Sequence, residues 1–363
     1  MSLGMVRSER LRRTGPCAWA RMAVVYLGLG VLSPASAVTV KDNLYGVKAL
    51  SRTEAVAVGN FGSVYRTTDG GTSWESRDSG VIEPLFSVDF GTPTTGWAVG
   101  KSATIITTTD GGATWKAQHS PIPPEKHLFK VAAIDASTAW AVGDWGAMAV
   151  THDGGATWKD RSLGVITIKQ EVTPGRQMRT ISDDVILYDI QFMDAQHGAL
   201  VGEFGTLLMT IDAGESWEKR PTGTEKTLFG VGFASLDVGW AVGMDGLVVS
   251  TKDGGKTWQR QRGRDDKVAL DDLGFLDTLK NPGLYAVRVV GRTGVVAGDT
   301  GLLLTTADGG ETWAQLELPA KQRLTWMRDV SVVAGGDGFV VGANGFTAKV
   351  EQGKVKLPTM GAH

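Results

Sequence analysis

The chain is almost without cysteine: Cys17 is the only one among its 363 residues. A fold stapled by disulfides and a metal centre ligated by several thiolates are therefore excluded. The histidines are also scattered without the spacing of a metal site, at His119, His127, His152, His197 and His363. We expect neither a metal nor a cofactor.

Motifs of the common enzyme classes are missing too. The sequence contains no Gly-x-Ser-x-Gly nucleophile elbow and no phosphate-binding loop. After residue 38, no apolar run approaches the ~20 residues that span a bilayer. The chain is instead rich in Gly, with 49 residues, and in Trp, with 12. This much glycine suits a chain that turns every few residues.

Residues 1–37 have the pattern of a secretory signal peptide. A basic start is followed by an apolar run from Met22 to Leu32 and by small residues that end at Ala37. We predict cleavage after Ala37 and a periplasmic or secreted mature protein, with an uncleaved anchor as the alternative. Cleavage removes Cys17 and leaves a formal net charge of about −6, which does not favour nucleic acid or anionic lipid as a partner.

One motif, Asp-x-Gly-x-Ser/Thr-Trp, recurs six times after the signal segment. Its first and last residues are Asp69 and Trp74, Asp110 and Trp115, Asp153 and Trp158, Asp212 and Trp217, Asp253 and Trp258, and Asp308 and Trp313. An apolar strand ending in Gly precedes each copy, and this strand occurs a seventh time before Gly342. The period of about forty residues is typical of a repeat architecture.

Each repeat has the pattern of four short antiparallel strands. In the second unit, residues 85–90, 96–99 and 104–109 have strand character, and the Asp110 turn leads into a fourth strand. Four strands in about forty residues make one propeller blade. We therefore predict an all-β fold in which residues 38–363 form a single seven-bladed β-propeller. An inserted hairpin (165–181) and an inserted short helix (265–279) lengthen two of the units.

The seventh unit departs from the pattern. Gln352, Gly353 and Lys354 stand where the Asp turn is expected, and a short strand follows. Because the last blade has to meet the first, residues 38–41 could supply an outer strand to this unit. The C-terminal end of the chain is the alternative.

The recurring Asp is expected to have a structural role. An Asp that opens a turn can accept hydrogen bonds from backbone N–H groups two or three residues on, and the Trp can bury its ring against neighbouring strands. Calcium binding or catalysis is the alternative, but a metal needs several oxygens at one point, whereas the motif supplies one carboxylate per blade.

Other aromatic residues follow the repeat as well. One second-strand position holds Trp97, Trp140 and Trp240, and one first-strand position holds Tyr45, Phe86, Phe129, Tyr188, Phe229 and Tyr285. The periodicity predicts both sets to be core residues. Arg328 takes the seventh first-strand position, and Trp145 stands in a turn where polar residues are expected. Such departures are where function is sought.

We expect a partner to bind the face opposite the Asp turns. Strand direction alternates within a blade, so the second-to-third turns and the blade-to-blade crossings, with both insertions, share that face. The candidate binding residues are the aromatic turn residues, the basic residues of the first insertion and the exceptional arginine: Phe61, Trp145, Phe204, Lys169, Arg176, Arg179 and Arg328. The alternative is that the rings fold back against the insertions and cover them.

The Asp motif resembles the Asp-box, or bacterial neuraminidase repeat. Together with Ala-Val-Gly-x-x-Gly in seven units and a signal segment, it is similar to the photosystem II stability/assembly factor family of propellers, across essentially the whole mature chain. The resemblance implies a non-enzymatic helper that aids assembly of a membrane complex from the lumenal or periplasmic side.

We therefore expect a scaffold or assembly factor whose partner is a membrane or envelope protein complex. The alternative is a sialidase-like or other glycoside hydrolase, or a glycan-binding propeller, since those proteins also carry Asp-boxes. Sialidases need an arginine triad, a Tyr/Glu nucleophile pair and an acid Asp, and they usually carry an Arg-Ile-Pro motif near the N-terminus. The sequence has no Arg-Ile-Pro, and its tyrosines after the signal segment occupy repeat or strand positions. The repeat itself does not decide the function.

Overall fold

The computed structural model describes residues 37–164, 168–170, 184–263 and 281–357. Almost all of the signal segment, most of the first insertion and all of the second insertion lie outside these ranges. The described residues belong to one compact unit and consist of β-strands joined by turns and short 3-10 segments. None of their helices is long and apolar enough to cross a membrane.

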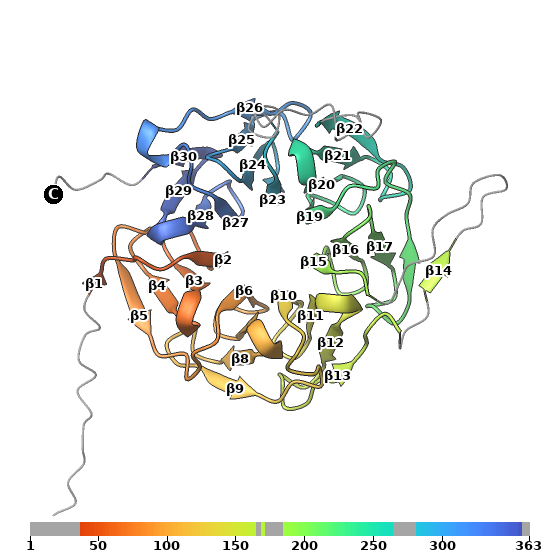
Figure 1. The fold of residues 1–363 in the computed structure, drawn as a ribbon. Helices are drawn as coiled ribbons and strands as arrows, with labels where there is room; N and C mark the ends of the chain where they lie inside the picture. Colours follow the sequence, from red (N-terminus) through yellow and green to blue (C-terminus); the bar gives the residue numbers. More distant parts are fainter. Residues whose placement is uncertain (1–36, 165–167, 171–183, 264–280, 358–363) are drawn as a thin grey trace, which may run out of the picture. The chain divides into compact units, whose positions relative to one another are not determined.

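Seven sheets follow one another along the chain, each with four consecutive antiparallel strands (Figure 1). The first strands are β2 (Leu44–Ala49), β6 (Leu85–Phe90), β10 (Leu128–Ala133), β15 (Leu187–Phe192), β19 (Leu228–Phe233), β23 (Leu284–Val290) and β27 (Met327–Val332). The second strands are β3 (Ala55–Gly59), β7 (Gly96–Gly100), β11 (Ala139–Gly143), β16 (Gly198–Gly202), β20 (Gly239–Gly243), β24 (Thr293–Gly298) and β28 (Gly338–Gly342). The third strands are β4 (Val64–Thr67), β8 (Ile105–Thr108), β12 (Met148–Thr151), β17 (Leu207–Thr210), β21 (Val248–Thr251), β25 (Leu303–Thr306) and β29 (Thr347–Glu351). The fourth strands are β5 (Trp74–Arg77), β9 (Lys116–Gln118), β13 (Lys159–Asp160), β18 (Trp217–Lys219), β22 (Gln259–Arg262), β26 (Ala314–Gln315) and β30 (Lys354–Lys356).

The sheets form a closed ring with the first strands at its centre (Figure 1). Each first strand packs against the next, and β2 packs against both β6 and β27, so that blade 7 meets blade 1. This arrangement confirms the predicted seven-bladed propeller.

The ring closes without an exchange of strands between its ends. Blade 7 is completed by β30, which pairs with β29 through a turn at Gln352 and Gly353. Of the two alternatives left open by the sequence, the C-terminal end therefore supplies this outer strand, and residues 38–41 do not. The N-terminal strand β1 (Ala37–Val38) instead pairs with β5 in blade 1, where Val38 lies opposite Trp74. Because the C-terminal turn already fills the outer edge of blade 7, that blade needs no strand from the N-terminus.

The first insertion also differs from expectation in its described part. Strand β14 (Ile168–Gln170) pairs in parallel with β18 and extends blade 4 at its outer edge. This strand therefore does not stand on the face of the crossings, because it hydrogen-bonds to the unpaired edge of β18. The rest of the predicted hairpin and the predicted helix lie outside the described residues.

The turns separate onto two faces, as expected. Backbone N–H groups of second-to-third turns donate to carbonyls of the blade-to-blade crossings, for example Gly146 to Val185 at 2.7 Å and Gly345 to Asp42 at 2.8 Å. We call this side the crossing face. On the other side of the ring, backbone N–H groups of the Asp turns donate to carbonyls of the first-to-second turns. The Gly111 N–H, for example, donates to the Thr94 carbonyl at 2.9 Å. We call this side the Asp-turn face.

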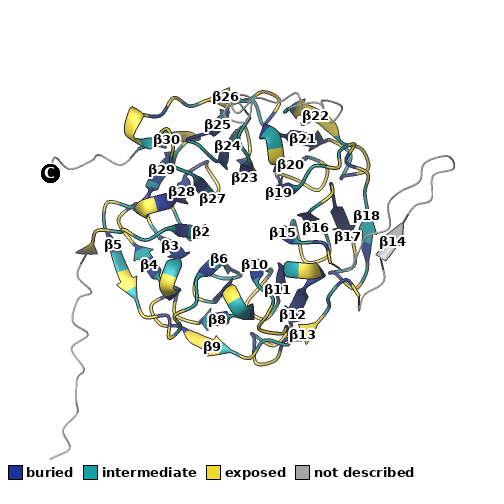
Figure 2. Ribbon diagram, in the orientation of Figure 1, coloured by how far each residue is buried: buried dark blue, intermediate teal, exposed yellow. Residues whose placement is uncertain are grey.

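The core lies between neighbouring blades (Figure 2). Second strands such as β7 and β11 are buried along their whole length, because each has a blade on either side. Their apolar residues therefore run continuously instead of alternating. Trp97, Trp140 and Trp240 are at most 2 % exposed, which confirms that they are core residues.

Candidate functional site

Each Asp motif forms the same closed turn. In blade 1, Asp69 Oδ1 accepts hydrogen bonds from the Ser73 backbone N–H and the Thr67 hydroxyl, both at 2.9 Å, and Oδ2 accepts one from the Ser73 hydroxyl at 2.6 Å. The Thr67 hydroxyl oxygen in turn accepts a hydrogen bond from Gly71 N–H at 2.9 Å. The same set of bonds recurs around Asp110, Asp153, Asp212, Asp253 and Asp308.

The threonine two residues before each Asp was missed in the sequence. It occupies the same place in all six copies, at Thr67, Thr108, Thr151, Thr210, Thr251 and Thr306, and it is buried in each. An extended motif, Thr-x-Asp, was visible in the repeat and would have found it.

The geometry of these turns leaves the carboxylates little chemistry to perform. Hydrogen bonds from the Thr157 hydroxyl and backbone N–H, and from the Thr151 hydroxyl, lower the pKa of Asp153 to about 2. Equivalent bonds lower the pKa of Asp308. These carboxylates therefore stay ionised at neutral pH, and their oxygens already accept hydrogen bonds from within the turn. Within the described ranges, no group of three or more His, Cys, Asp or Glu residues could hold a metal ion.

A ring of aromatic side chains surrounds one mouth of the central channel. It is formed by the first-strand aromatics, at a position where every first strand carries a β-bulge, for instance between Leu44 and Gly46 in β2. A bulge leaves its residue out of the ladder and redirects the side chain. The prediction that Tyr45, Phe86, Phe129, Tyr188, Phe229 and Tyr285 are core residues is therefore wrong: all six are only partly buried.

We call this ring the aromatic girdle; its members contact one another in blade order. Ring centroids are 5.6 Å apart for Tyr45–Phe86 and Phe86–Phe129, 5.7 Å for Phe129–Tyr188, 5.0 Å for Tyr188–Phe229 and 5.6 Å for Phe229–Tyr285. Blade 7 completes the circle with two side chains. Arg328 places its guanidinium carbon 4.5 Å from the centroid of Tyr285, and Trp326 stacks on Tyr45.

The girdle borders a cavity of about 310 Å³, lined by Tyr45, Phe86, Phe129, Tyr285, Trp326 and Arg328. Burial raises the pKa of Tyr188 and of Tyr285, so the phenols remain neutral hydrogen-bond donors at neutral pH. The cavity is thus a mostly aromatic hollow with one cationic side chain. Arg328 was a candidate from the sequence, whereas the remaining lining residues were not.

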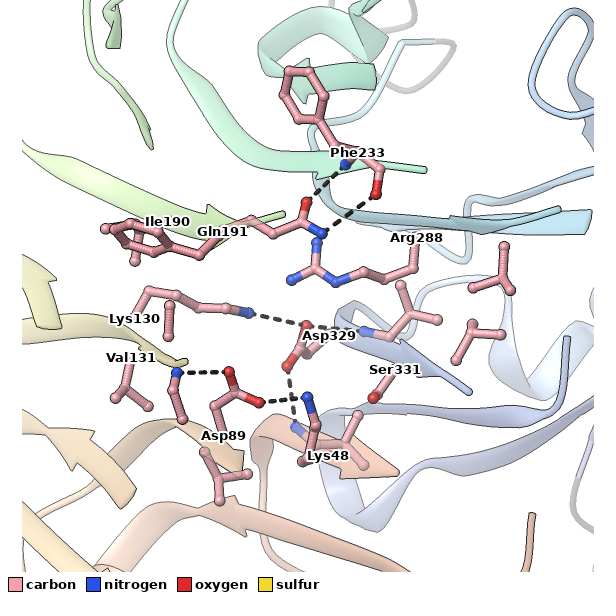
Figure 3. A pocket seen from close by; sticks show the side chains of 18 of the residues that line it. Lys48, Asp89, Lys130, Val131, Ile190, Gln191, Phe233, Arg288, Asp329 and Ser331 are labelled. Atoms are coloured by element: carbon pink, nitrogen blue, oxygen red, sulfur yellow. Dashed lines mark hydrogen bonds and ion pairs between the residues drawn. The ribbon is translucent and has the colours of Figure 1, made fainter. Parts of the chain in front are cut away.

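The channel beyond the girdle is polar, and its side chains are already engaged (Figure 3). Lys48 pairs with Asp89 at 2.5 Å, and Lys130 lies 3.3 Å from Asp329 and 3.7 Å from Asp189. The carboxylates also accept backbone hydrogen bonds from the neighbouring blade: Asp329 from Val47 at 3.1 Å and Asp189 from Val231 at 2.9 Å. These groups satisfy the inner edges of the first strands, which would otherwise leave buried N–H groups unpaired.

The aromatic turn residues lie on the crossing face and are exposed. Phe61 is 78 % exposed, Trp145 49 % and Phe204 56 %. Each sits in a second-to-third turn with positive φ, at 55°, 47° and 54° respectively. A left-handed backbone costs a non-Gly residue about 1 kcal/mol or more, and about half or more of each residue's surface stays exposed to solvent.

The basic candidates of the first insertion do not form a described patch. Lys169 lies in β14 at the outer edge of blade 4, while Arg176 and Arg179 lie outside the described residues. The structure therefore brings Phe61, Trp145, Phe204 and Arg328 onto one face.

Comparison with solved structures finds the same fold in several proteins. A structure described as YCF48 bound to D1 peptide matches with a TM-score of 0.64 and 20 % identity over 87 % of this chain and 95 % of that one. YCF48 from Cyanidioschyzon merolae matches with a TM-score of 0.65 and 21 % identity, over 86 % of this chain and 97 % of that one. An ancestral GH74 enzyme matches with a TM-score of 0.62 and 14 % identity, over 89 % of this chain but only 47 % of that one.

At the level of sequence, no curated protein matches the chain. The sequence profile of one family does match, and that family is described as photosynthesis system II assembly factor YCF48. Its matches cover residues 78–166, 168–262 and 221–324, well over half of the chain. The protein therefore belongs to the YCF48 family of photosystem II assembly factors.

Proposed function

We propose that this propeller is an exported, non-enzymatic scaffold that helps to assemble or stabilise a membrane or envelope protein complex. In this role it binds a segment of its client on the crossing face. Family membership supports the class of function, and the peptide-bound YCF48 structure supports a polypeptide ligand. The signal pattern of residues 1–37 supports export.

The observation that carries the proposal is the placement of three aromatic side chains. Phe61, Trp145 and Phe204 combine exposure with a strained backbone, on the same face. Selection for stability alone favours Gly, Asn or Asp at positive φ. Exposed aromatic residues are also typical anchors of protein interfaces. A binding role accounts both for the exposure of these aromatic side chains and for their place at positive φ.

The glycosidase alternative has less support. The GH74 match extends over less than half of that enzyme, and glycoside hydrolysis needs two carboxyl groups free to act on one bond. The channel carboxylates Asp89, Asp189 and Asp329 instead accept backbone hydrogen bonds and pair with Lys48 or Lys130.

Copurification from native envelopes tests the proposal. Tagged wild-type protein is expected to retain subunits of a membrane or envelope complex, and Trp145→Ala is expected to lose most of them. Ile211→Ala is the matched control, because Ile211 is 72 % exposed beside an Asp turn on the opposite face. If only the free propeller is recovered and the protein turns over a glycoside substrate, the scaffold function is wrong and the glycosidase function is favoured.

A further inference from the structure

We propose that the aromatic girdle is a binding pocket for an aromatic side chain of a client peptide that carries a carboxylate beside it, with Arg328 as the anion-binding residue. The inference rests on the proposed function in that the occupant is a client segment. It adds a second, central site to the exposed turn residues and states the chemistry that this site recognises.

The first argument is the repeated bulge. Seven successive first strands break their ladder at the same place, and six of them use the break to turn an aromatic ring toward the channel mouth. Ordinary alternation would have buried these rings between blades. A feature built into every blade leaves apolar surface facing a hollow at the centre of the crossing face.

The second argument is size and lining. A volume of about 310 Å³ lies at the lower end of the roughly 300–1,000 Å³ of ligand pockets, and it suits one amino-acid side chain better than a large cofactor. The lining rings meet in several geometries: 74° for Tyr45–Phe86, 34° for Phe86–Phe129, and a parallel stack for Tyr45–Trp326. A guest ring can join them in the offset and edge-on geometries that aromatic pairs prefer.

The third argument is charge. The three basic residues deeper in the channel each have carboxylate partners: Lys48, Lys130 and Arg288 lie near Asp89, Asp189 or Asp329. In the part of the chain that the structure describes, Arg328 forms no salt bridge with a carboxylate; it lies over the face of Tyr285 and acts electrostatically on Tyr188 as well. A half-buried guanidinium binds a carboxylate through paired N–H donors. An aromatic hollow alone would favour a cation, but Arg328 already holds that place and repels one.

These arguments select an acidic and aromatic guest. Arg328 borders the same cavity as the rings, so the carboxylate has to lie within one or two residues of the aromatic side chain. Tyr45 and Tyr285 hydroxyls already bond to Asn60 and Asp299 of the adjoining turns, which holds these two rings in place before a guest arrives.

The test uses blocked tetrapeptides, whose ends carry no charge. Acetyl-Gly-Asp-Phe-Gly-amide is expected to quench part of the protein's tryptophan fluorescence saturably, because Trp326 lines the cavity, with a Kd of about 1 mM or below. Replacing its Asp by Asn, or its Phe by Ala, should weaken binding about tenfold. The first change removes the carboxylate that Arg328 binds, and the second removes the ring that enters the cavity. In the Arg328→Gln protein, the Asp and Asn peptides should bind equally.

Two controls keep the result interpretable. Arg323→Gln removes the same charge from an exposed residue of the crossing between blades 6 and 7, and it should leave the preference for the Asp peptide intact. Phe129→Leu keeps the apolar volume and should weaken the Phe peptide in a folded protein. Equal binding of the Asp and Asn peptides to wild type, or no saturable binding of any peptide, overturns the proposal.

The copurification experiment separates this inference from the proposed function. If wild type and Arg328→Gln retain the same client to the same extent, the girdle is not its binding site and the scaffold function stands. If wild type retains no client, the scaffold function fails, and the peptide titrations alone decide whether the girdle binds an acidic aromatic segment.

Discussion

Trp326 and Tyr45 stack with ring centroids 5.6 Å apart and planes only 3° from parallel. Trp326 directly precedes the first strand of blade 7, and Tyr45 belongs to the first strand of blade 1. Since no strand is exchanged between these blades, side chains such as these hold the ends of the ring together. Asp329 adds to the same junction by accepting the Val47 backbone N–H at 3.1 Å.

Asp329→Ala should therefore destabilise the propeller by about 2–4 kcal/mol. The substitution leaves the Val47 N–H unsatisfied and removes one of the two carboxylates around Lys130. Urea unfolding measures the change. Ser331→Ala is the matched control, because its hydroxyl accepts the Ala49 N–H at the same junction but carries no charge, and about 1–2 kcal/mol is expected. Equal losses would show that the charge of Asp329 contributes nothing to closure.

The blades could be predicted from the sequence because their signals are local. Strand alternation, the Asp turn and its glycines all lie within about forty residues, so each unit defines its own four strands. The buried places of Trp97, Trp140 and Trp240 followed from the same periodicity. The pairing of β1 with β5 could not be predicted, because it depends on how the C-terminal turn at Gln352 and Gly353 fills the edge of blade 7.

The girdle was missed because a bulge changes the alternation that the prediction used. Tyr45 and Gly46 are neighbours in sequence, and period-two alternation places them on opposite sides of the strand. The break in the ladder between Leu44 and Gly46 turns the Tyr45 ring toward the channel mouth instead. Channel residues such as Asp189 and Lys130 do not repeat from blade to blade, because each serves a particular backbone group or charge of its neighbour.

Acid should destabilise the protein between about pH 4 and pH 2. The pKa of Asp153 is lowered to about 2 by hydrogen bonds from Thr157 and Thr151, whereas an unfolded Asp titrates near 3.9. Because the unfolded chain binds protons at a higher pH than the folded one, the stabilisation is present above pH 4 and is lost as the pH falls through the folded pKa. Thermal melts across this range check the prediction.

The Asp153→Asn protein provides the comparison for that pH series. Its melting temperature should be lower than that of wild type at neutral pH, because the charged acceptor is lost, and the difference should shrink toward pH 2. A constant difference across the whole range would contradict a role for the ionised carboxylate.

Trp145 and Trp140 should respond in opposite ways to truncation. Trp140 is 1 % exposed, so Trp140→Ala should cost about 3–5 kcal/mol. Trp145 is 49 % exposed with φ near 47°, so Trp145→Gly should leave the melting temperature unchanged or raise it slightly, because glycine relieves the left-handed backbone. Calorimetry of both variants measures this. A large loss of stability in Trp145→Gly would show that the indole packs as core and would remove it from the candidate site.

The two sequence signatures of the repeat meet across a blade boundary, and the last prediction tests that meeting. A Cβ on Gly214, in the Asp turn of blade 4, would lie 2.4 Å from Trp140 Cζ2 in blade 3, and its φ is +90°. Gly214→Ala should therefore cost about 3–5 kcal/mol, from overpacking and backbone strain together. Gly223→Ala has a similar φ of +72° but no atom within 4 Å, so it should cost only about 1–2 kcal/mol. If the clash is the larger cause, Trp140→Leu combined with Gly214→Ala should cost less than the sum of the single changes in urea unfolding. Strict additivity would instead mean that the glycine serves the turn alone and not the packing of one blade on the next.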